Sequence, residues 1–368
     1  MNYAWFGVLL ISSSRLTSSE EESGQEEDTK DVIYLGFYFV YDNDFQNRAS
    51  TFRDEDGGFN TYLSVLTKAA EVRFKDVDDP RIVLTLANSS LLKDERIIKK
   101  SHTGGKTLVK GESTMLELER TMTWNDSLPD GVDVVFLITG LETLTEESMI
   151  TKEWKGVAQP KAICMWDGNT NGKAVGIVHD DGSTFSGAQT LALQVALLLG
   201  ASKDGTRRYG RSVSQCSASD GYLTSRITGG SRPSLSECSR HDLREFFLTN
   251  KNRSHICWND QVEAATSNAQ MLPAQFYEER VHDLCEVPRS HISQFSRLYE
   301  CGNEVTQYRP KDCKIECCDY LRNTYRPKKS ITAPDGTKCS EDDDEDDDDE
   351  DDNEDDDDKK ICVYGECI

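Results

Sequence analysis

The stretch Thr190-Leu-Ala-Leu-Gln-Val-Ala-Leu-Leu-Leu-Gly-Ala-Ser-Lys-Asp-Gly205 is the most informative part of this 368-residue chain. Its first ten residues are rich in Ala and Leu, and Ala and Leu favour helices. Gly200 is a residue type that commonly ends a helix, and Ser186 is a suitable N-terminal cap. The pattern therefore predicts a helix over residues 186–201.

Before this helix, strand-like and helix-like patterns alternate along the chain. β-branched and aromatic residues at 32–40 and a continuous apolar run at 134–138 predict β-strands. Apolar residues recur at helical spacing from Phe59 to Phe74, and Ser113 is a candidate cap for another helix. Strands that alternate with helices are typical of an α/β domain with a mostly parallel sheet. Further strands are predicted at residues 82–87, 162–166 and 174–178.

Composition excludes two classes of protein. No apolar run reaches the ~20 residues that a membrane-spanning helix needs, so no membrane contact is expected. The formal net charge is −24, of which the acidic run at residues 341–358 supplies −17 through every residue except Asn353. An acidic surface repels phosphate groups, so nucleic acid is not an expected ligand.

The acidic run cannot bury apolar area, and self-repulsion should keep it extended. It could attract basic surfaces of partner proteins by long-range electrostatic steering. It could also collect calcium ions loosely, although it lacks the spaced ligands and the glycine of an EF-hand loop. A solvated loop that only improves solubility is an equally good interpretation.

The twelve cysteines are unevenly distributed. None precedes Cys164, four lie between Cys164 and Cys257, and eight lie between Cys285 and Cys367. Two even groups predict two units that are closed separately by disulfides, and their density indicates an oxidising, extracellular compartment. Three Asn-x-Ser sequons fit a secreted glycoprotein: Asn88, Asn125 and Asn252.

Changes in composition predict the organisation of the chain. Residues 1–17 contain a short apolar run followed by serines, which resembles a signal peptide, although a fragment of a longer precursor fits as well. Residues 18–30 are acidic and predicted to be disordered. An α/β domain is predicted at residues 31–266. A cysteine-rich module is predicted at residues 280–368, with the acidic run as an insertion and disulfides in place of a large core.

The quoted stretch resembles the active-site helix of the reprolysin (adamalysin) family of zinc metalloproteases, and the chain as a whole is similar to tick salivary members of that family. The family pattern is H-E-x-x-H-x-x-G-x-x-H-D. Gly200 matches its glycine, and Asp204 matches its final aspartate. The three histidine positions hold Leu193, Leu197 and Lys203, and the glutamate position holds Gln194.

Downstream segments support the resemblance, which implies a metzincin-like fold. The segment Asp220-Gly-Tyr-Leu-Thr-Ser225 resembles the family's Met-turn, with Thr224 in place of the methionine. Residues 235–257 resemble the end of the family's catalytic domain, and the cysteine spacing of residues 313–367 resembles the module that follows it. Four cysteines alone allow three pairings. The resemblance implies that Cys216 pairs with Cys238 and Cys164 with Cys257.

The chemistry of a zinc protease is missing from these positions. Two histidines four residues apart on a helix face the same way and can hold one zinc ion, and the glutamate between them activates the zinc-bound water. Leucine offers zinc no lone pair, Gln194 is a neutral amide that cannot act as a general base, and the charge of Lys203 disfavours a cation. No two of the six histidines are four residues apart, so the motif exists in no other register.

These substitutions predict a secreted, catalytically inactive pseudoprotease that has no zinc cofactor and acts by binding an extracellular protein. Leu193 and Leu197 would fill the former metal pocket, because burying a leucine contributes ~1.5–3 kcal/mol. An apolar cleft that holds a partner peptide is the sharper alternative. The resemblance implies saliva as the source and host extracellular or haemostatic proteins as partners. An active zinc metalloendopeptidase and a decayed copy without function are the competing interpretations.

Overall fold

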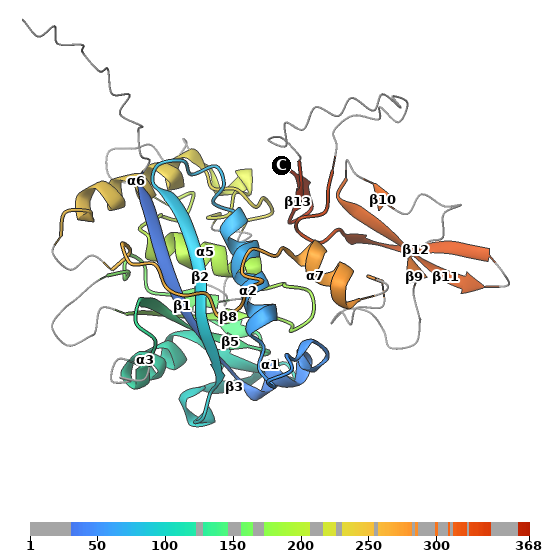
Figure 1. Ribbon diagram of the computed structural model, residues 1–368, viewed down its shortest axis with the longest axis horizontal. Helices are drawn as coiled ribbons and strands as arrows, with labels where there is room; N and C mark the ends of the chain where they lie inside the picture. Colours follow the sequence, from blue (N-terminus) through green and yellow to red (C-terminus); the bar gives the residue numbers. More distant parts are fainter. Residues whose placement is uncertain are drawn as a thin grey trace, which may run out of the picture.

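The computed structural model describes residues 31–122, 128–145, 156–164, 173–206, 216–225, 230–253, 257–281, 284–285, 299–300, 308–309, 312–321, 324–339 and 360–368. The predicted signal peptide, the acidic segment 18–30, the sequon at Asn125 and the acidic run lie outside the described residues. No helix among the described residues is both long and apolar enough to cross a membrane. The chain forms a larger α/β unit and a smaller, disulfide-rich unit beside it (Figure 1).

A five-stranded sheet forms the centre of the larger unit, with the strand order β2-β1-β5-β8-β7. Four strands run parallel: β1 (Val32–Tyr41), β2 (Arg81–Leu91), β5 (Val132–Thr139) and β8 (Ala174–His179). The edge strand β7 (Gly156–Ala158) runs antiparallel to β8. The predicted α/β class and mostly parallel sheet are confirmed, whereas the metzincin-like identity of the fold stays a prediction.

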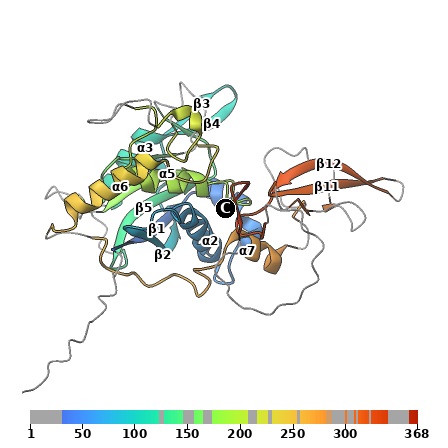
Figure 2. The same cartoon turned by 90° about the horizontal axis from the view of Figure 1, so that it is seen from above.

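Helices cover both faces of this sheet (Figures 1 and 2). α2 (Asn60–Val72) and α5 (Ala188–Leu198) pack against each other on one face, and both confirm predicted helices. α3 (Gly111–Met122) covers the opposite face. This unit also contains α1 (Asn43–Arg48), α6 (Glu237–Asn250), and a small sheet of β3 (Lys100–Thr103), β4 (Lys106–Lys110) and β6 (Thr143–Leu144).

The central strand β5 shows why the sheet needs helices on both faces. The side chains of Val134, Phe136 and Ile138 lie in the larger apolar core, with α2 and α5. Those of Val135 and Leu137 lie in a second core, with α3. Successive side chains of a strand point to opposite faces, so a continuous apolar run requires a covering layer on each side.

The strand predicted at residues 162–166 is wrong. Residues 162–164 form a turn, and residues 165–166 lie outside the described residues. Lys161 and Cys164 adopt φ angles of 60° and 54°, which a β-strand does not permit. The strand at this edge of the sheet is instead β7, a few residues earlier.

Two predicted helix caps are also wrong. Ser113 lies within the first turn of α3, which begins two residues before it. Ser186 precedes α5, but its Oγ accepts the N–H of Asp181 at 3.0 Å instead of capping the helix. The N–H of Gly187, at the start of α5, donates to Asp180 Oδ2 at 2.7 Å, so a carboxylate from the preceding loop takes part of the role predicted for the serine.

The smaller unit is held together by disulfides. Cys285–Cys317, Cys313–Cys362 and Cys339–Cys367 link its segments, and most of these cysteines are buried with Ile315 and Ile331. Disulfides thus replace much of the apolar core that so small a unit lacks. Its strands are β9 (Tyr299–Glu300), β10 (Tyr308–Arg309), β11 (Lys314–Leu321), β12 (Thr324–Thr332), β13 (Cys362–Val363) and β14 (Glu366–Cys367).

α7 (Pro273–Arg280) connects the two units along the chain and packs into the larger one. Its Phe276 and Tyr277 are buried in the larger core. The ring centroid of Phe276 lies 5.2 Å from those of both Phe52 and Phe185. The larger packing unit therefore extends past residue 266, where the sequence places the end of the α/β domain.

A buried carboxylate lies at the amino end of β5. Asp133 is 3% exposed, and its Oδ2 accepts the N–H of Gly36 at 2.8 Å. Burial raises the pKa of Asp133 to about 8, and the charge of Asp260 adds to this shift. The folded chain therefore keeps a proton on Asp133 over a pH range in which the unfolded chain has released it.

We predict that Asp133 makes the free energy of unfolding fall as the pH rises. Its contribution is fully present below the unfolded pKa of 3.8 and is lost as the pH rises through the folded pKa of about 8. The neutral variant Asp133→Asn should match the natural chain at pH ~4 and be more stable by on the order of 1–3 kcal/mol at pH ~9. Urea denaturation at a series of pH values measures the difference, and identical pH profiles would contradict the prediction.

Candidate functional site

The positions that the resemblance assigns to zinc chemistry lie on α5 and in the loop after it. Leu193 and Leu197 are one helical turn apart, so their side chains lie on the same side of α5. Leu197 is 6% exposed, and Leu193 is partly buried against the larger core. Gln194 is 4% exposed, and Lys203 lies partly exposed in the loop that follows. Hydrocarbon side chains therefore occupy the side of α5 where the family has two histidines.

Gly200 ends α5 in a conformation that favours glycine, with φ at 96°. Its N–H donates to the carbonyl of Leu197, and the N–H of Ala201 donates to the carbonyl of Ala196 at 2.9 Å, which closes the last turn. A Cβ at Gly200 would lie 2.7 Å from the Cβ of Phe246 on α6. Both the backbone and the close packing therefore require glycine at this position.

Asp204 and Thr224 meet in a buried polar cluster with Ser236, the N-cap residue of α6, and Ser239 in its first turn. Asp204 and Thr224 are both 0% exposed. Thr224 Oγ1 donates to Asp204 Oδ2 at 3.0 Å, and Ser236 Oγ donates to Asp204 Oδ1 at 2.7 Å. Ser239 Oγ lies 2.7 Å from Thr224 Oγ1. The cluster joins the loop after α5 to the turn at residues 220–225 and to α6.

Two disulfides brace the same region. Cys216–Cys238 connects the chain before the turn to the first turn of α6. Cys164–Cys257 connects the turn after β7 to the chain after α6. These are the two pairs that the resemblance implies. Together with the Asp204 cluster, they fix the chain on the C-terminal side of α5.

The described residues contain no set of side chains that fits a zinc ion. One group brings together the Sγ atoms of Cys313, Cys339 and Cys362, all within 4.8 Å of one another. All three sulfurs belong to disulfides, so none is the thiolate that binds zinc. On α5, the two leucines have no donor atom. The donor atoms at the positions given by the resemblance therefore do not fit the zinc chemistry of the family.

A second buried aspartate fixes the chain before α5. Asp180 is 0% exposed and accepts three hydrogen bonds, from the Tyr62 hydroxyl and the Gly182 N–H at 2.8 Å each and from the Gly187 N–H at 2.7 Å. Burial raises the pKa of Asp180 to about 7, and the charge of Asp181 adds to the shift. No role was predicted for Asp180, although its place two residues after the strand predicted at residues 174–178 was an available signal.

The loop between Asp180 and α5 is held by aromatic side chains. Phe185 adopts a φ of 52°, and its ring stacks on Tyr62 of α2 with 4.3 Å between ring centroids. The Phe185 N–H donates to the Tyr62 hydroxyl at 3.1 Å. From α7, the Tyr277 hydroxyl donates to the carbonyl of Ser183 at 2.6 Å. α2 and α7 thus position the start of α5 together.

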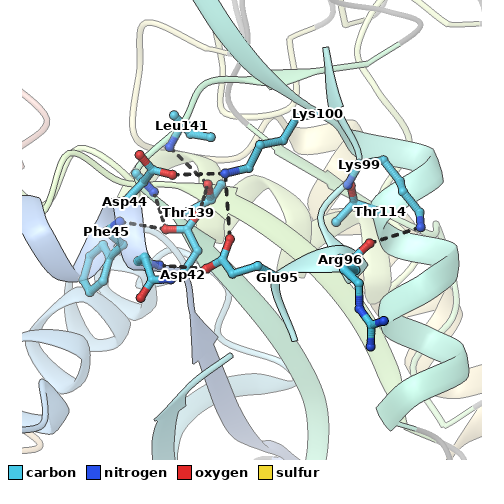
Figure 3. A network of polar contacts seen from close by, with 12 residues as sticks. Asp42, Asp44, Phe45, Glu95, Arg96, Lys99, Lys100, Thr114, Thr139 and Leu141 are labelled. Carbon is cyan, nitrogen blue, oxygen red and sulfur yellow. Dashed lines mark hydrogen bonds and ion pairs between the residues drawn. The ribbon is translucent and has the colours of Figure 1, made fainter. Parts of the chain in front are cut away.

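After β1 the chain continues to one edge of the central sheet, and after β5 it continues to the other edge. Open α/β sheets commonly bind ligands beside the carboxyl ends of two such strands. In this protein the side chain of Asp42, which is 0% exposed, lies at these strand ends. Its Oδ1 accepts the N–H groups of Phe45 and Gly140 at 2.7 and 3.1 Å, and its Oδ2 accepts the Thr139 hydroxyl at 2.5 Å (Figure 3).

Charged side chains surround Asp42 and pair with one another (Figure 3). Lys100 Nζ lies 3.4 Å from Asp44 Oδ2 and 3.8 Å from Glu95 Oε2. Glu95 Oε1 accepts the Asn43 N–H at 3.1 Å. This network ties the strand ends to α1 and to the chain before β3. We interpret it as structural, because the buried carboxylate already receives three internal hydrogen bonds.

No family model matches the sequence, and no curated protein matches it. Among solved structures, a chain from a chaperone–substrate complex is 12% identical, with a TM-score of 0.36. The match covers 65% of this protein and 34% of the chain in that complex, so this protein spans about one third of that chain's length. Archaemetzincin from Methanopyrus kandleri is 10% identical with a TM-score of 0.31, over 58% of this chain and 96% of that one. Likenesses this weak establish neither a family nor an activity, so the reprolysin family and the tick relatives stay predictions.

We predict that the Asp204 cluster contributes measurably to stability. Ser236→Ala removes a donor to the buried carboxylate together with the acceptor for the Ser239 N–H at the N-cap of α6. The free energy of unfolding should fall by ~1–3 kcal/mol. The exposed Ser219 provides a matched control, and Ser219→Ala should change stability by less than ~0.5 kcal/mol. Denaturant titration compares the two variants, and equal losses would rule out a special role for the cluster.

Proposed function

We propose that this protein is a secreted, non-catalytic relative of reprolysin-type metalloproteases that acts by binding an extracellular protein. The observation that supports this best is the composition of α5. The positions for two zinc ligands and the general base hold Leu193, Leu197 and Gln194, and Leu197 and Gln194 are buried. Peptide hydrolysis by a zinc ion requires three protein ligands and an open fourth position for water. Hydrocarbon side chains provide neither.

Secretion is part of the same proposal. Disulfides in both units favour an oxidising compartment. Two of the three sequon asparagines are described and exposed: Asn88 on β2 and Asn252 after α6. Glycans at these positions would project into solvent without disturbing the core. These features support an extracellular glycoprotein.

We place the peptide contact at β7, next to α5. Among the described strands, β7 pairs with β8 alone, and we assign the added strand to its other edge. A Cβ at Gly156 would lie 2.7 Å from Thr190 Cγ2, so α5 lies against one face of β7. Addition of an extended peptide to a sheet edge is a common mode of recognition. The resemblance favours host extracellular or haemostatic proteins as the source of the peptide.

We expect purified protein to contain far less than one zinc ion per chain by elemental analysis. A variant with the motif restored, Leu193→His, Gln194→Glu, Leu197→His and Lys203→His, should bind one zinc ion per chain, because two histidines one turn apart and a third beyond them complete the ligand set. A matched control keeps Lys203 and carries only the other three substitutions. It should bind zinc at least about tenfold more weakly, since one ligand is missing.

The zinc content of the natural protein tests the proposal even if the restored variant does not fold. Stoichiometric zinc together with peptide cleavage would overturn it and support the competing zinc metalloendopeptidase. If zinc is absent, the next measurement is capture of extracellular and haemostatic proteins on the immobilised chain. Failure of every such protein to bind would favour the decayed copy over the binding protein.

A further inference from the structure

Arg73 follows the last residue of α2, and its side chain is 2% exposed. Its Nε donates to Gln189 Oε1 at 2.7 Å, and its Nη1 donates to the carbonyl of Ala69. Nη1 also lies 2.9 Å from Asp335 Oδ2 in the smaller unit, and Cζ lies 5.8 Å from the centre of the Tyr364 ring. A guanidinium withdrawn from water requires such partners, and here they come from both units.

In the smaller unit, Asp335 connects Arg73 to the C-terminal hairpin of β13 and β14. Its Oδ1 accepts the N–H of Tyr364 at 2.7 Å, and its carbonyl accepts the N–H of Ala274 at the start of α7 at 2.9 Å. Tyr364 and Gly365 adopt φ angles of 52° and 86° in the two-residue turn of this hairpin. One carboxylate therefore binds the guanidinium and holds the hairpin tip.

In the larger unit, Gln189 links Arg73 to the loop at residues 230–235 through hydrogen bonds to both. Its Oε1 faces the guanidinium, and its Nε2 donates to the carbonyl of Arg232 at 2.8 Å. The side-chain amide thus has one orientation, because rotation by half a turn would place its NH2 group against Arg73. Gln189 is one helical turn before Leu193, so it lies on the same side of α5.

Backbone hydrogen bonds fix the loop at residues 230–235 against the turn at residues 220–225. The N–H of Arg232 donates to the carbonyl of Gly221, and the N–H of Leu223 donates to the carbonyl of Ser234, both at 2.8 Å. A continuous chain of polar contacts therefore runs from the hairpin tip through Asp335, Arg73 and Gln189 into this loop. The C-terminal end lies beside the end of α2, where Arg73 contacts Asp335 and Tyr364 (Figure 2).

We propose that Arg73 is a latch between the two units, which couples docking of the C-terminal hairpin to the conformation of the loop at residues 230–235. When the hairpin leaves Arg73, the guanidinium loses its carboxylate and Gln189 loses a fixed partner. The hydrogen bond to the Arg232 carbonyl then weakens. A protein that grips the hairpin tip would in this way change the surface beside α5. The latch is independent of whether the chain binds zinc.

The test measures hydrogen exchange of the Arg232 and Leu223 amides in the full chain. Asp335→Asn removes the charge that pairs with Arg73. The substitution lies in the smaller unit, whereas the two amides measured lie in the larger one. We expect these two amides to exchange at least about fivefold faster in the variant, while amides of β5 keep their protection. Unchanged exchange in the loop would overturn the latch, and so would faster exchange spread evenly through β5.

A double-mutant cycle shows whether Gln189 carries the coupling. Gln189→Met fills a similar volume but cannot bond either Arg73 or the Arg232 carbonyl. On this background, Asp335→Asn should no longer change exchange in the loop at residues 230–235, because the connection is already broken. Additive effects of the two substitutions would refute coupling through Gln189 and with it the latch.

Two further variants keep the test decisive. Glu366→Gln removes a carboxylate from the same hairpin without altering Asp335, and it should leave loop exchange unchanged. Asp335→Glu retains the charge but displaces it by one methylene, so its effect on loop exchange should be smaller than that of Asp335→Asn. If Asp335→Asn does not fold, Gln189→Met supplies the measurement, because it breaks the same connection, and loop exchange no faster than in Glu366→Gln would overturn the proposal.

Discussion

The burial of carboxylates is the constraint on which the loops of the larger unit depend. Asp42, Asp133, Asp180 and Asp204 are each 3% exposed or less. A carboxylate out of water must receive hydrogen bonds or keep its proton. The donors found here are backbone amides and hydroxyl groups of neighbouring strands, loops and helix starts. Because moving any of these loops would leave a buried oxygen without a partner, the sheet ends and both ends of α5 are held in place.

The same constraint fixes the chain on either side of α5. Asp180 has three donors before the helix, and Asp204 has hydroxyl donors after it. Between these two anchors, α5 carries the apolar side chains of Leu193 and Leu197. In the proposed function, the buried donors would preserve the shape of this region for binding, without a metal ion.

The distribution of apolar residues was enough to predict β1, β5, α2 and α5. Their spacing indicated β1 and α2, a continuous apolar run indicated β5, and Ala- and Leu-rich composition indicated α5. Features set by contacts between distant residues were not predictable. Cys164 lies in an apolar run that favours a strand, but its φ of 54° and its disulfide to Cys257 make a turn there. The hydrogen bond of Thr224 to Asp204 leaves no mark in the sequence, because a lone threonine has many uses. The burial of Arg73 depends on Asp335, far along the chain, which no local pattern indicates.

α7 has a consequence for how such proteins can evolve by recombination. It lies between the two units along the chain, yet Phe276 and Tyr277 complete the core around Tyr62 and Phe185. A crossover before α7 would combine the α/β unit of one protein with the α7 of another. The aromatic core around Tyr62 and Phe185 would then receive a helix that did not evolve to fit it. A crossover that preserves both cores has to fall after α7, and the incoming module must still offer a carboxylate to Arg73. The cysteine-rich unit is thus not a freely exchangeable cassette, and its lineage should follow that of the α/β unit to which it is fitted.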